Sequence, residues 1–402
     1  MSASIFGLAA LTAVVGATSV AHAAPSFPKG ALIVDDDGAD CPRAQFDSIQ
    51  DAVDAAQPGG VVGVCPGLYE ESVRVEKTLA ILGPKRGKDA RKRSLSSSGE
   101  AVVTSDSPFL LLADRVVLDG FTIITDLDDS GEGSGVLTWF EYSGYVIQNN
   151  VVDADGVTAI FPGTSGELRS HIRRNHLYNR LGVATSGDEP FAPAVNVHIV
   201  DNLFEYSTLL LASGEDDGVL VARNTFIEGG GIVIRGGSAM LVRGNKVYDP
   251  DGPAIEVGET QEVTIERNIL RDGAEEGILV HDATVRIVDN SVEGMNAAAV
   301  RLVEAGGTLV KENELEDSAA GVIIEQTSGA RVERNSIEDN AGAGVSIDGS
   351  SAGNVVKDNE VRGNGEPADC VDTSQGGGTS GTANAWSGNE GSDAEPEGLC
   401  ED

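Results

Sequence analysis

An asparagine recurs at nearly constant spacing between residues 150 and 359 of the 402-residue chain. A short apolar stretch runs into each one and then resumes, as in Val263–Leu270, and neighbouring asparagines are 21 to 27 residues apart. A period in this range indicates a repeat protein, in which one supersecondary unit stacks on copies of itself. The ten asparagines are Asn150, Asn175, Asn202, Asn224, Asn245, Asn268, Asn290, Asn313, Asn335 and Asn359.

Alignment of the repeats on this asparagine separates inward from outward positions. The third residue before it is always Ile or Val, and the second residue after it is Val, Leu, Ile or Phe, so both point into a core. A third apolar strand, opened by glycine in Gly231–Ile234 and Gly277–Val280, follows seven to nine residues after the asparagine. Three strands per turn predict an all-β fold, a parallel β-helix of three sheets and about eleven coils, ~50 Å long.

The asparagine itself falls at a tight corner between two strands. Asn tolerates left-handed backbone there, and its amide can bond the amides of the coils above and below. We therefore expect a structural ladder without a catalytic role. A leucine-rich repeat has a similar period but needs fixed leucines and a helical segment, and a β-propeller blade needs ~40 residues.

Segments at both ends lack the regular repeat. Asp47–Ala56 has apolar residues at helical spacing and is stopped by Pro58-Gly59-Gly60, which predicts one capping helix before the first coils. From Asn364 onward the sequence is irregular. We therefore divide the chain into a signal peptide (1–23), an N-terminal cap with the first coils (24–100), a regular β-helix (101–363) and a Gly/Asn-rich C-terminal cap (364–402).

The N-terminal region also carries a family pattern. It reads Phe46-x-Ser48-Ile49-Gln50-x-Ala52-Val53, then Pro58-Gly59, Val64-x-Pro66-Gly67-x-Tyr69 and Leu82-Gly83. This pattern resembles the opening of pectin-lyase-like right-handed β-helix proteins, including pectin methylesterases, and the resemblance to the superfamily covers nearly the whole mature chain. It implies a right-handed coil and a polysaccharide groove outside the glycine-led sheet. The catalytic motifs of pectin methylesterases, mannuronan epimerases and polygalacturonases are missing.

Export from the cytoplasm is expected from both the N-terminus and the cysteines. Ile5–Val20 is apolar or small, and Ala21-His22-Ala23 forms a signal-cleavage pattern, so we expect a secreted protein, extracellular or in the cell envelope. No later stretch reaches the ~18 apolar residues of a membrane span. Four cysteines allow three pairings, of which Cys41–Cys65 with Cys370–Cys400 would clamp each end of the rod.

The charge balance limits the partners. With 64 acidic and 28 basic residues, the formal charge is −36 at pH 7, which disfavours nucleic acid and anionic lipid. Solubility explains most of this charge, and we expect a monomer.

Charged residues on the outward side of the glycine-led strands form the first candidate site. They form an ordered run of acidic and basic side chains along five consecutive coils, which could bind a uronate and supply a catalytic base; the alternative is ion pairing between coils. The candidate catalytic residues are Arg235, Glu256, His281, Arg301 and Glu325.

A second candidate site combines histidines, an arginine and aromatic residues, as a substrate-binding surface. His171 and His198 both lie four residues before an asparagine and should stack on neighbouring coils beside Arg173. Trp139 and Tyr142 could stack on sugar rings. Satisfied surface histidines and packing beneath the Leu127–Ser134 insertion are the alternatives.

A calcium site is the third candidate. Asp126, Asp128 and Glu132 resemble the first half of a calcium loop, although Leu137 stands where an EF-hand needs glutamate, and a hydrated turn is the alternative. Three functions therefore remain open. They are a secreted protein that binds or modifies polysaccharide or a cell-surface glycan, a lyase or esterase-like enzyme with or without Ca²⁺, and a structural or adhesive rod.

Overall fold

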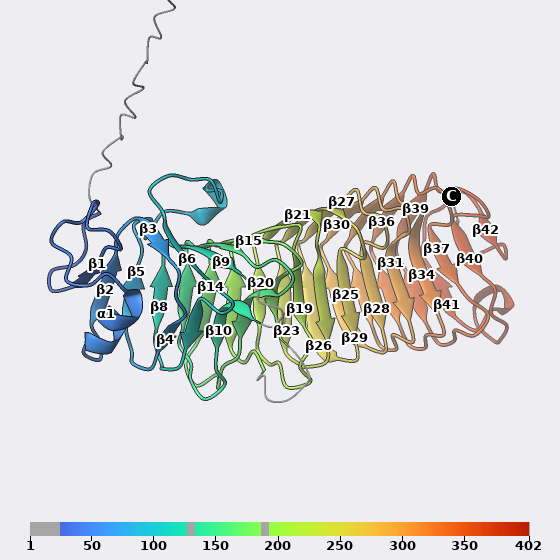
Figure 1. The fold of residues 1–402 in the computed structure, drawn as a ribbon. Helices are drawn as coiled ribbons and strands as arrows, with labels where there is room; N and C mark the ends of the chain where they lie inside the picture. Colours follow the sequence, from blue (N-terminus) through green and yellow to red (C-terminus); the bar gives the residue numbers. More distant parts are fainter. Residues whose placement is uncertain (1–24, 127–132, 186–192, 402) are drawn as a thin grey trace, which may run out of the picture.

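A computed structural model describes residues 25–126, 133–185 and 193–401. The predicted signal peptide lies outside these residues. Figure 1 shows an elongated rod whose coils follow one another in sequence order from the blue end to the red end. Each coil contributes one strand to each of three parallel sheets, which we call sheets A, B and C. The three-sheet parallel β-helix predicted from the sequence is confirmed.

Sheet A holds the strand that leads into each repeat asparagine. Its 15 strands, in spatial order, are β1 (Leu32–Val34), β2 (Val61–Val64), β5 (Ala80–Leu82), β8 (Val117–Asp119), β11 (Val146–Gln148), β14 (Ser170–Arg173), β17 (Val197–Val200), β20 (Leu220–Ala222), β23 (Met240–Arg243), β26 (Gln261–Glu266), β29 (Thr284–Val288), β32 (Leu309–Lys311), β35 (Arg331–Glu333), β38 (Val355–Lys357) and β41 (Ala385–Ser387).

Sheet B holds the strand that follows each asparagine. Its 13 strands are β3 (Gly67–Tyr69), β6 (Ala101–Ser105), β9 (Thr122–Thr125), β12 (Val151–Asp153), β15 (His176–Tyr178), β18 (Leu203–Glu205), β21 (Thr225–Gly229), β24 (Lys246–Pro250), β27 (Ile269–Arg271), β30 (Ser291–Glu293), β33 (Glu314–Glu316), β36 (Ser336–Glu338) and β39 (Glu360–Arg362).

Sheet C holds the third, often glycine-led strand. Its 14 strands are β4 (Val73–Val75), β7 (Phe109–Leu111), β10 (Ser134–Thr138), β13 (Thr158–Pro162), β16 (Leu181–Ala184), β19 (Thr208–Leu211), β22 (Ile232–Arg235), β25 (Ile255–Gly258), β28 (Ile278–His281), β31 (Ala298–Val303), β34 (Ala320–Glu325), β37 (Val345–Ile347), β40 (Cys370–Asp372) and β42 (Ala394–Glu395).

The prediction of about eleven coils was too low, because sheets of 15, 14 and 13 strands need more turns of the chain. The missing coils lie at the ends of the rod. The first coils carry no repeat asparagine, and the last ladder residue, Asn389, lies beyond a longer interval of 30 residues. A count based on a regular asparagine therefore undercounts coils at both ends.

The asparagine ladder has the predicted structural role, but the asparagine is not the residue with left-handed backbone. In one rung, the backbone N and Nδ2 of Asn268 both donate to Asn290 Oδ1, at 3.0 and 2.9 Å, and Nδ2 also donates to the Val242 carbonyl at 3.1 Å. The left-handed residue is the one before the asparagine, as in Arg267 (φ 55°) and Asp289 (φ 59°). That residue turns the corner with its side chain outward, while the asparagine side chain bonds inside.

The N-terminal end of the rod is closed by a helix and a disulfide. At the N-terminal end, α1 (Ile49–Ala55) packs its buried face over the first coil and begins at Ser48, whose side chain accepts from the Asp51 amide. Glu71 accepts from the amides of Ile49 and Gln50 at the same helix end. The pairing Cys41–Cys65 is confirmed. Within the described residues, no helix is long and apolar enough to cross a membrane.

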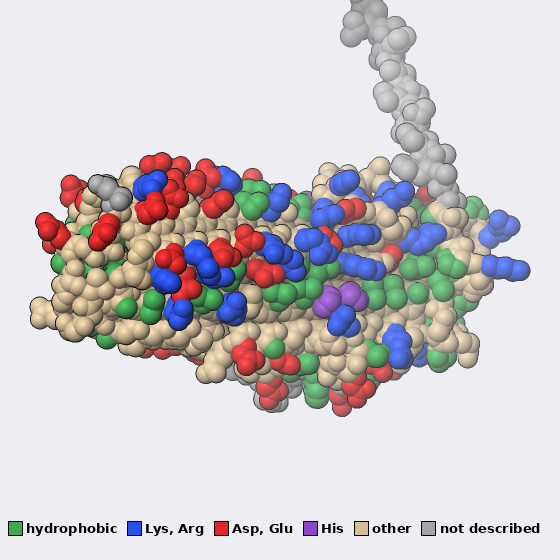
Figure 2. Space-filling model, turned by 180° about the vertical axis from the view of Figure 1, so that it is seen from behind, with side chains coloured by type: hydrophobic (Ala, Val, Ile, Leu, Met, Phe, Trp, Pro, Cys, Tyr) green, Lys and Arg blue, Asp and Glu red, His purple; other side chains and the backbone are tan. Residues whose placement is uncertain are grey.

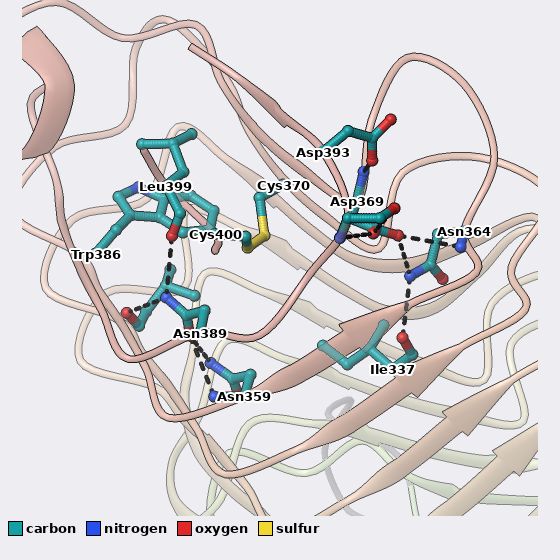
Figure 3. The surroundings of a disulfide bond; sticks show 12 residues. Ile337, Asn359, Asn364, Asp369, Cys370, Trp386, Asn389, Asp393, Leu399 and Cys400 are labelled. Atoms are coloured by element: carbon teal, nitrogen blue, oxygen red, sulfur yellow. Dashed lines mark hydrogen bonds between the residues drawn. A yellow bond between two sulfur atoms is a disulfide. The ribbon is translucent and has the colours of Figure 1, made fainter. Parts of the chain in front are cut away.

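The C-terminal end carries the second predicted disulfide, Cys370–Cys400. Figure 3 shows it beside the final rungs of two side-chain ladders, one running from Asn359 to Asn389 and one from Asn364 to Asp369. Trp386 covers the end of the core, buried, with its indole N–H donating to Asp372 at 2.9 Å. Two short 3-10 helices, η1 (Ala90–Lys92) and η2 (Thr379–Gly381), lie outside the sheets.

Candidate functional site

The five predicted catalytic residues lie on five consecutive strands of sheet C, β22 to β34, but in two neighbouring columns. Arg235, His281 and Glu325 share one column, in register with Gly258 and Val303 on the intervening strands. Glu256 and Arg301 share the next column, in register with Leu279 between them. The charged side chains therefore form a zigzag along the sheet.

The zigzag splits into two ion-paired clusters. Arg235 Nη2 lies 2.9 Å from Glu256 Oε1, and His281 Nε2 lies 3.2 Å from the same oxygen. In the second cluster, Arg301 lies 3.2 Å from Glu276 and 2.9 Å from Glu325, and these carboxylates raise the pKa of its guanidinium, Glu325 most strongly. Ion pairing between coils, the alternative to a catalytic role, is thus present at all five residues. Glu276, beside Gly277, was missed by the sequence reasoning.

The two histidines lie on sheet A, away from that zigzag. His171 of β14 and His198 of β17 are paired in register, and their ring centroids are 5.3 Å apart at an interplanar angle of 90°. The predicted placement of the two histidines on neighbouring coils is confirmed, with the rings edge to face. Burial lowers the pKa of both imidazoles, and nearby arginines, Arg173 and Arg169 at His171 and Arg169 at His198, lower it further.

Two arginines flank the histidines without a carboxylate partner. Arg173 Nε donates to the Gln148 side chain at 2.8 Å, and Arg169 Nε donates to the Asn196 side chain at 3.2 Å. Among the described residues, neither arginine has a carboxylate oxygen within 4.0 Å. Alternation along the strand would have found Arg169, which lies two residues before His171 and faces the same side. Within the described part of the chain, the cluster therefore carries positive charge without a paired carboxylate.

The histidines interrupt an outward row of apolar side chains on sheet A. Val117, Val146, His171, His198, Leu220 and Leu241 occupy one register position on six consecutive coils, and all are partly exposed. Figure 2 shows histidine side chains next to hydrophobic side chains on the surface of the rod, with Lys and Arg side chains nearby. We call Arg169, Arg173, His171 and His198, with the apolar row beside them, the histidine face.

The aromatic candidates lie at the turn that connects sheet C to sheet A. Trp139 directly follows β10 and is partly exposed, with its ring 6.0 Å from that of Phe140, an exposed residue. Tyr142 is partly buried and packs against the core, which favours the packing alternative for this residue. The turn leads to Tyr145, whose carbonyl accepts from the His171 amide.

The predicted calcium loop falls largely outside the described residues. Asp126 is exposed, and its amide donates to the Ser105 carbonyl, whereas Asp128 and Glu132 are not among the residues described. Within the described part of the chain, the three-carboxylate group that could hold a metal ion is Asp35, Asp36 and Asp37. Neither histidine of the histidine face belongs to such a group, so among the described residues a metal ion there would have no third ligand.

Comparison with known proteins supports the fold. A family model described as "Right handed beta helix region" matches residues 134–315 and 230–389. The A-module of the Azotobacter vinelandii mannuronan C-5 epimerase AlgE6 is 14% identical, with a TM-score of 0.51 over 86% of this chain and 92% of that one. The catalytic unit of a GH87 α-1,3-glucanase from Streptomyces thermodiastaticus is 20% identical, with a TM-score of 0.57 over 92% of this chain and 71% of that one. No curated protein matches the sequence.

Proposed function

The chain belongs to the right-handed β-helix family, and from that premise we propose that it binds an acidic polysaccharide on its histidine face, outside the cytoplasm. One observation carries the proposal. In a chain of formal charge −36, two arginines and two histidines gather on one sheet face, and among the described residues neither arginine has a carboxylate partner. The two disulfides fit an oxidising compartment.

The chemistry of the face matches a uronate-containing glycan. Each guanidinium can donate charge-assisted hydrogen bonds to a sugar carboxylate, and such bonds are about twice as strong as neutral ones. The apolar side chains of Val146 and Leu220, on either side of the histidines, offer a surface for the non-polar faces of sugar rings. Because the coils stack in register, neighbouring sugars along a chain would meet equivalent positions on neighbouring strands. The names of the two solved structures with this fold both refer to polysaccharides, which supports this ligand class.

Binding measurements test the proposal directly. We expect isothermal titration to show saturable binding of an oligouronate and no binding of a neutral oligosaccharide of the same length. Arg173→Gln and Arg169→Gln should each weaken binding at least tenfold, because each removes an unpaired cation. Arg235→Gln, on sheet C, is the matched control and should bind normally. Equal binding of neutral and acidic sugars, or loss of binding in the control alone, would overturn the proposal.

A catalytic function on sheet C is the second candidate, and the contact between Glu256 and His281 favours it. A carboxylate hydrogen-bonded to an imidazole can serve as a general acid–base pair, and Arg235 could hold a substrate carboxylate beside it. Release of unsaturated uronates, followed by ultraviolet absorbance with and without a chelator, tests lyase activity. Glu256→Gln and His281→Ala should abolish such activity. A rod with a purely structural or adhesive function would show neither activity nor glycan binding.

A further inference from the structure

Three consecutive aspartates in the N-terminal cap converge on one point. Asp35, Asp36 and Asp37 follow β1, and each places a carboxylate oxygen within 4.8 Å of the others. Asp35 is buried, at 3% exposure, whereas Asp36 and Asp37 are exposed. The group is therefore open to solvent on one side and closed by protein on the other.

Only one of the two carboxylate oxygens of the buried Asp35 accepts a hydrogen bond from the described residues. Its Oδ2 accepts from the Cys41 amide at 2.5 Å, but its Oδ1 is buried and has no hydrogen-bond partner among the described residues. A buried polar oxygen without a partner costs about 1–3 kcal/mol, and more when it is charged. Such an atom calls for an explanation, and a bound water or ion is one.

Backbone amides hold the other two carboxylates in place. Asp36 Oδ2 accepts from the Leu68 amide of β3 at 2.9 Å, and Asp37 Oδ1 accepts from the Ala39 amide at 2.8 Å. In the described part of the chain, the second oxygen of each has no hydrogen-bond partner. The three carboxylates are thus positioned by the backbone, and each retains an oxygen for a ligand.

Repulsion among the three carboxylates raises the free energy of the folded state when no cation is bound. Asp35 is buried at 3% exposure, and the carboxylate oxygens of Asp36 and Asp37 lie within 4.8 Å of its own. Among the described residues, no lysine or arginine pairs with any of these aspartates. The like charges therefore repel one another, and no described side chain compensates them.

We propose that Asp35, Asp36 and Asp37 bind a calcium ion that locks the N-terminal cap. All the donors are oxygens, which suit a hard cation, and two oxygens on opposite sides of Ca²⁺ are about 4.6–5.2 Å apart at its usual bond lengths. A partly exposed three-carboxylate site with water in the remaining positions fits the affinity of extracellular calcium modules, about 10⁻⁴–10⁻³ M. The ion would join the end of β1, the Cys41 loop and β3 at the disulfide Cys41–Cys65.

Calorimetric titration of the full chain with CaCl₂, combined with thermal unfolding in Ca²⁺ and in chelator, tests this site. We expect one saturable site and a higher unfolding temperature in Ca²⁺ for the wild type. Asp35→Asn should weaken Ca²⁺ binding at least tenfold, yet unfold at or above the wild-type temperature in chelator, because the amide removes a repelled charge and still accepts from Cys41.

Two further variants keep the test decisive. The side chain of Asp37 is exposed, so the Asp37→Asn variant should fold normally. It should also bind Ca²⁺ more weakly than the wild type. Asp126→Asn, in the loop first considered for calcium, is the control and should bind as the wild type does. Absence of a Ca²⁺ effect in the wild type would overturn the proposal, as would an equal loss of binding in the Asp126→Asn variant.

Discussion

His171 and His198 face each other on neighbouring coils of sheet A, with ring centroids 5.3 Å apart and ring planes perpendicular. Burial lowers the pKa of both rings below the ordinary value of 6.5, with Arg169 and Arg173 contributing. The groups around the pair on the adjoining strands, Val146 and Leu220, are uncharged, so nothing there offsets the arginines. Both imidazoles are therefore mostly neutral at pH 7, and an anion would favour their protonation.

Binding of an acidic glycan should consequently strengthen as the pH falls. A bound carboxylate raises the pKa of the imidazoles, so binding takes up protons, and affinity should rise up to about tenfold per pH unit for each proton taken up. Titration calorimetry of an oligouronate at about pH 8 and about pH 5.5 measures this slope. A His171→Gln, His198→Gln double variant should bind with little pH dependence. An unchanged slope in that variant would exclude the histidines as the titrating groups.

Asp216 should make stability depend on pH in the opposite sense to most carboxylates. It is 1% exposed and accepts bonds from Thr185, Ala194 and Ser213, yet burial raises its pKa to about 6. The folded state thus keeps a proton that the unfolded chain releases, so this contribution is present below about pH 4 and is lost as the pH rises through about 6.

The expected loss of stability from Asp216 is about 3 kcal/mol over that range. Chemical denaturation at several pH values gives the free energy of unfolding of the wild type and of Asp216→Asn. The difference in their pH dependence isolates the contribution of Asp216, because the amide does not titrate. Asp217→Asn, at the exposed neighbouring residue, should leave the wild-type slope unchanged. If the wild type and Asp216→Asn show the same slope, Asp216 is ionised throughout.

The sequence predicted the interior of the coil better than its outer surface. Inward positions repeat at fixed offsets from a residue such as Asn268, because the two strands that flank it join at a short corner of constant length. The turns between sheets B and C vary in length, so the register of Arg235 relative to Glu256 could not be read from their distances to the repeat asparagines. The Asp35 cluster was not predicted as a site, because the burial of Asp35 depends on the loop held by Cys41–Cys65.

Each disulfide should stabilise one end of the rod. The bonded cysteines are separated by 24 residues in Cys41–Cys65 and by 30 residues in Cys370–Cys400. The loss of loop entropy in the unfolded chain depends on the logarithm of loop length, so each is worth about 3–4 kcal/mol. Replacing either pair with serines should therefore lower the free energy of unfolding by similar amounts in denaturant titrations. A loss at only one end would show that the other cap is held by packing alone.

Removal of one interior asparagine should be among the most destabilising single changes. Asn290 is 2% exposed; its Oδ1 accepts from the backbone N and Nδ2 of Asn268, and its Nδ2 donates to the Ile265 carbonyl and to Asn313. In Asn290→Ala these buried groups lose their partner, and at about 1–3 kcal/mol for each unsatisfied group the cost should reach about 3–5 kcal/mol.

Hydrogen exchange locates this cost, because coils of a solenoid contact only their neighbours and can open locally. The Asn268 amide should exchange much faster in Asn290→Ala, while amides at the far end of the rod keep their protection. Asn296→Ala removes an exposed side chain one coil corner away and should change neither stability nor exchange by more than about 0.5 kcal/mol. Equal effects of the two substitutions would mean that the ladder contributes no more than a surface amide does.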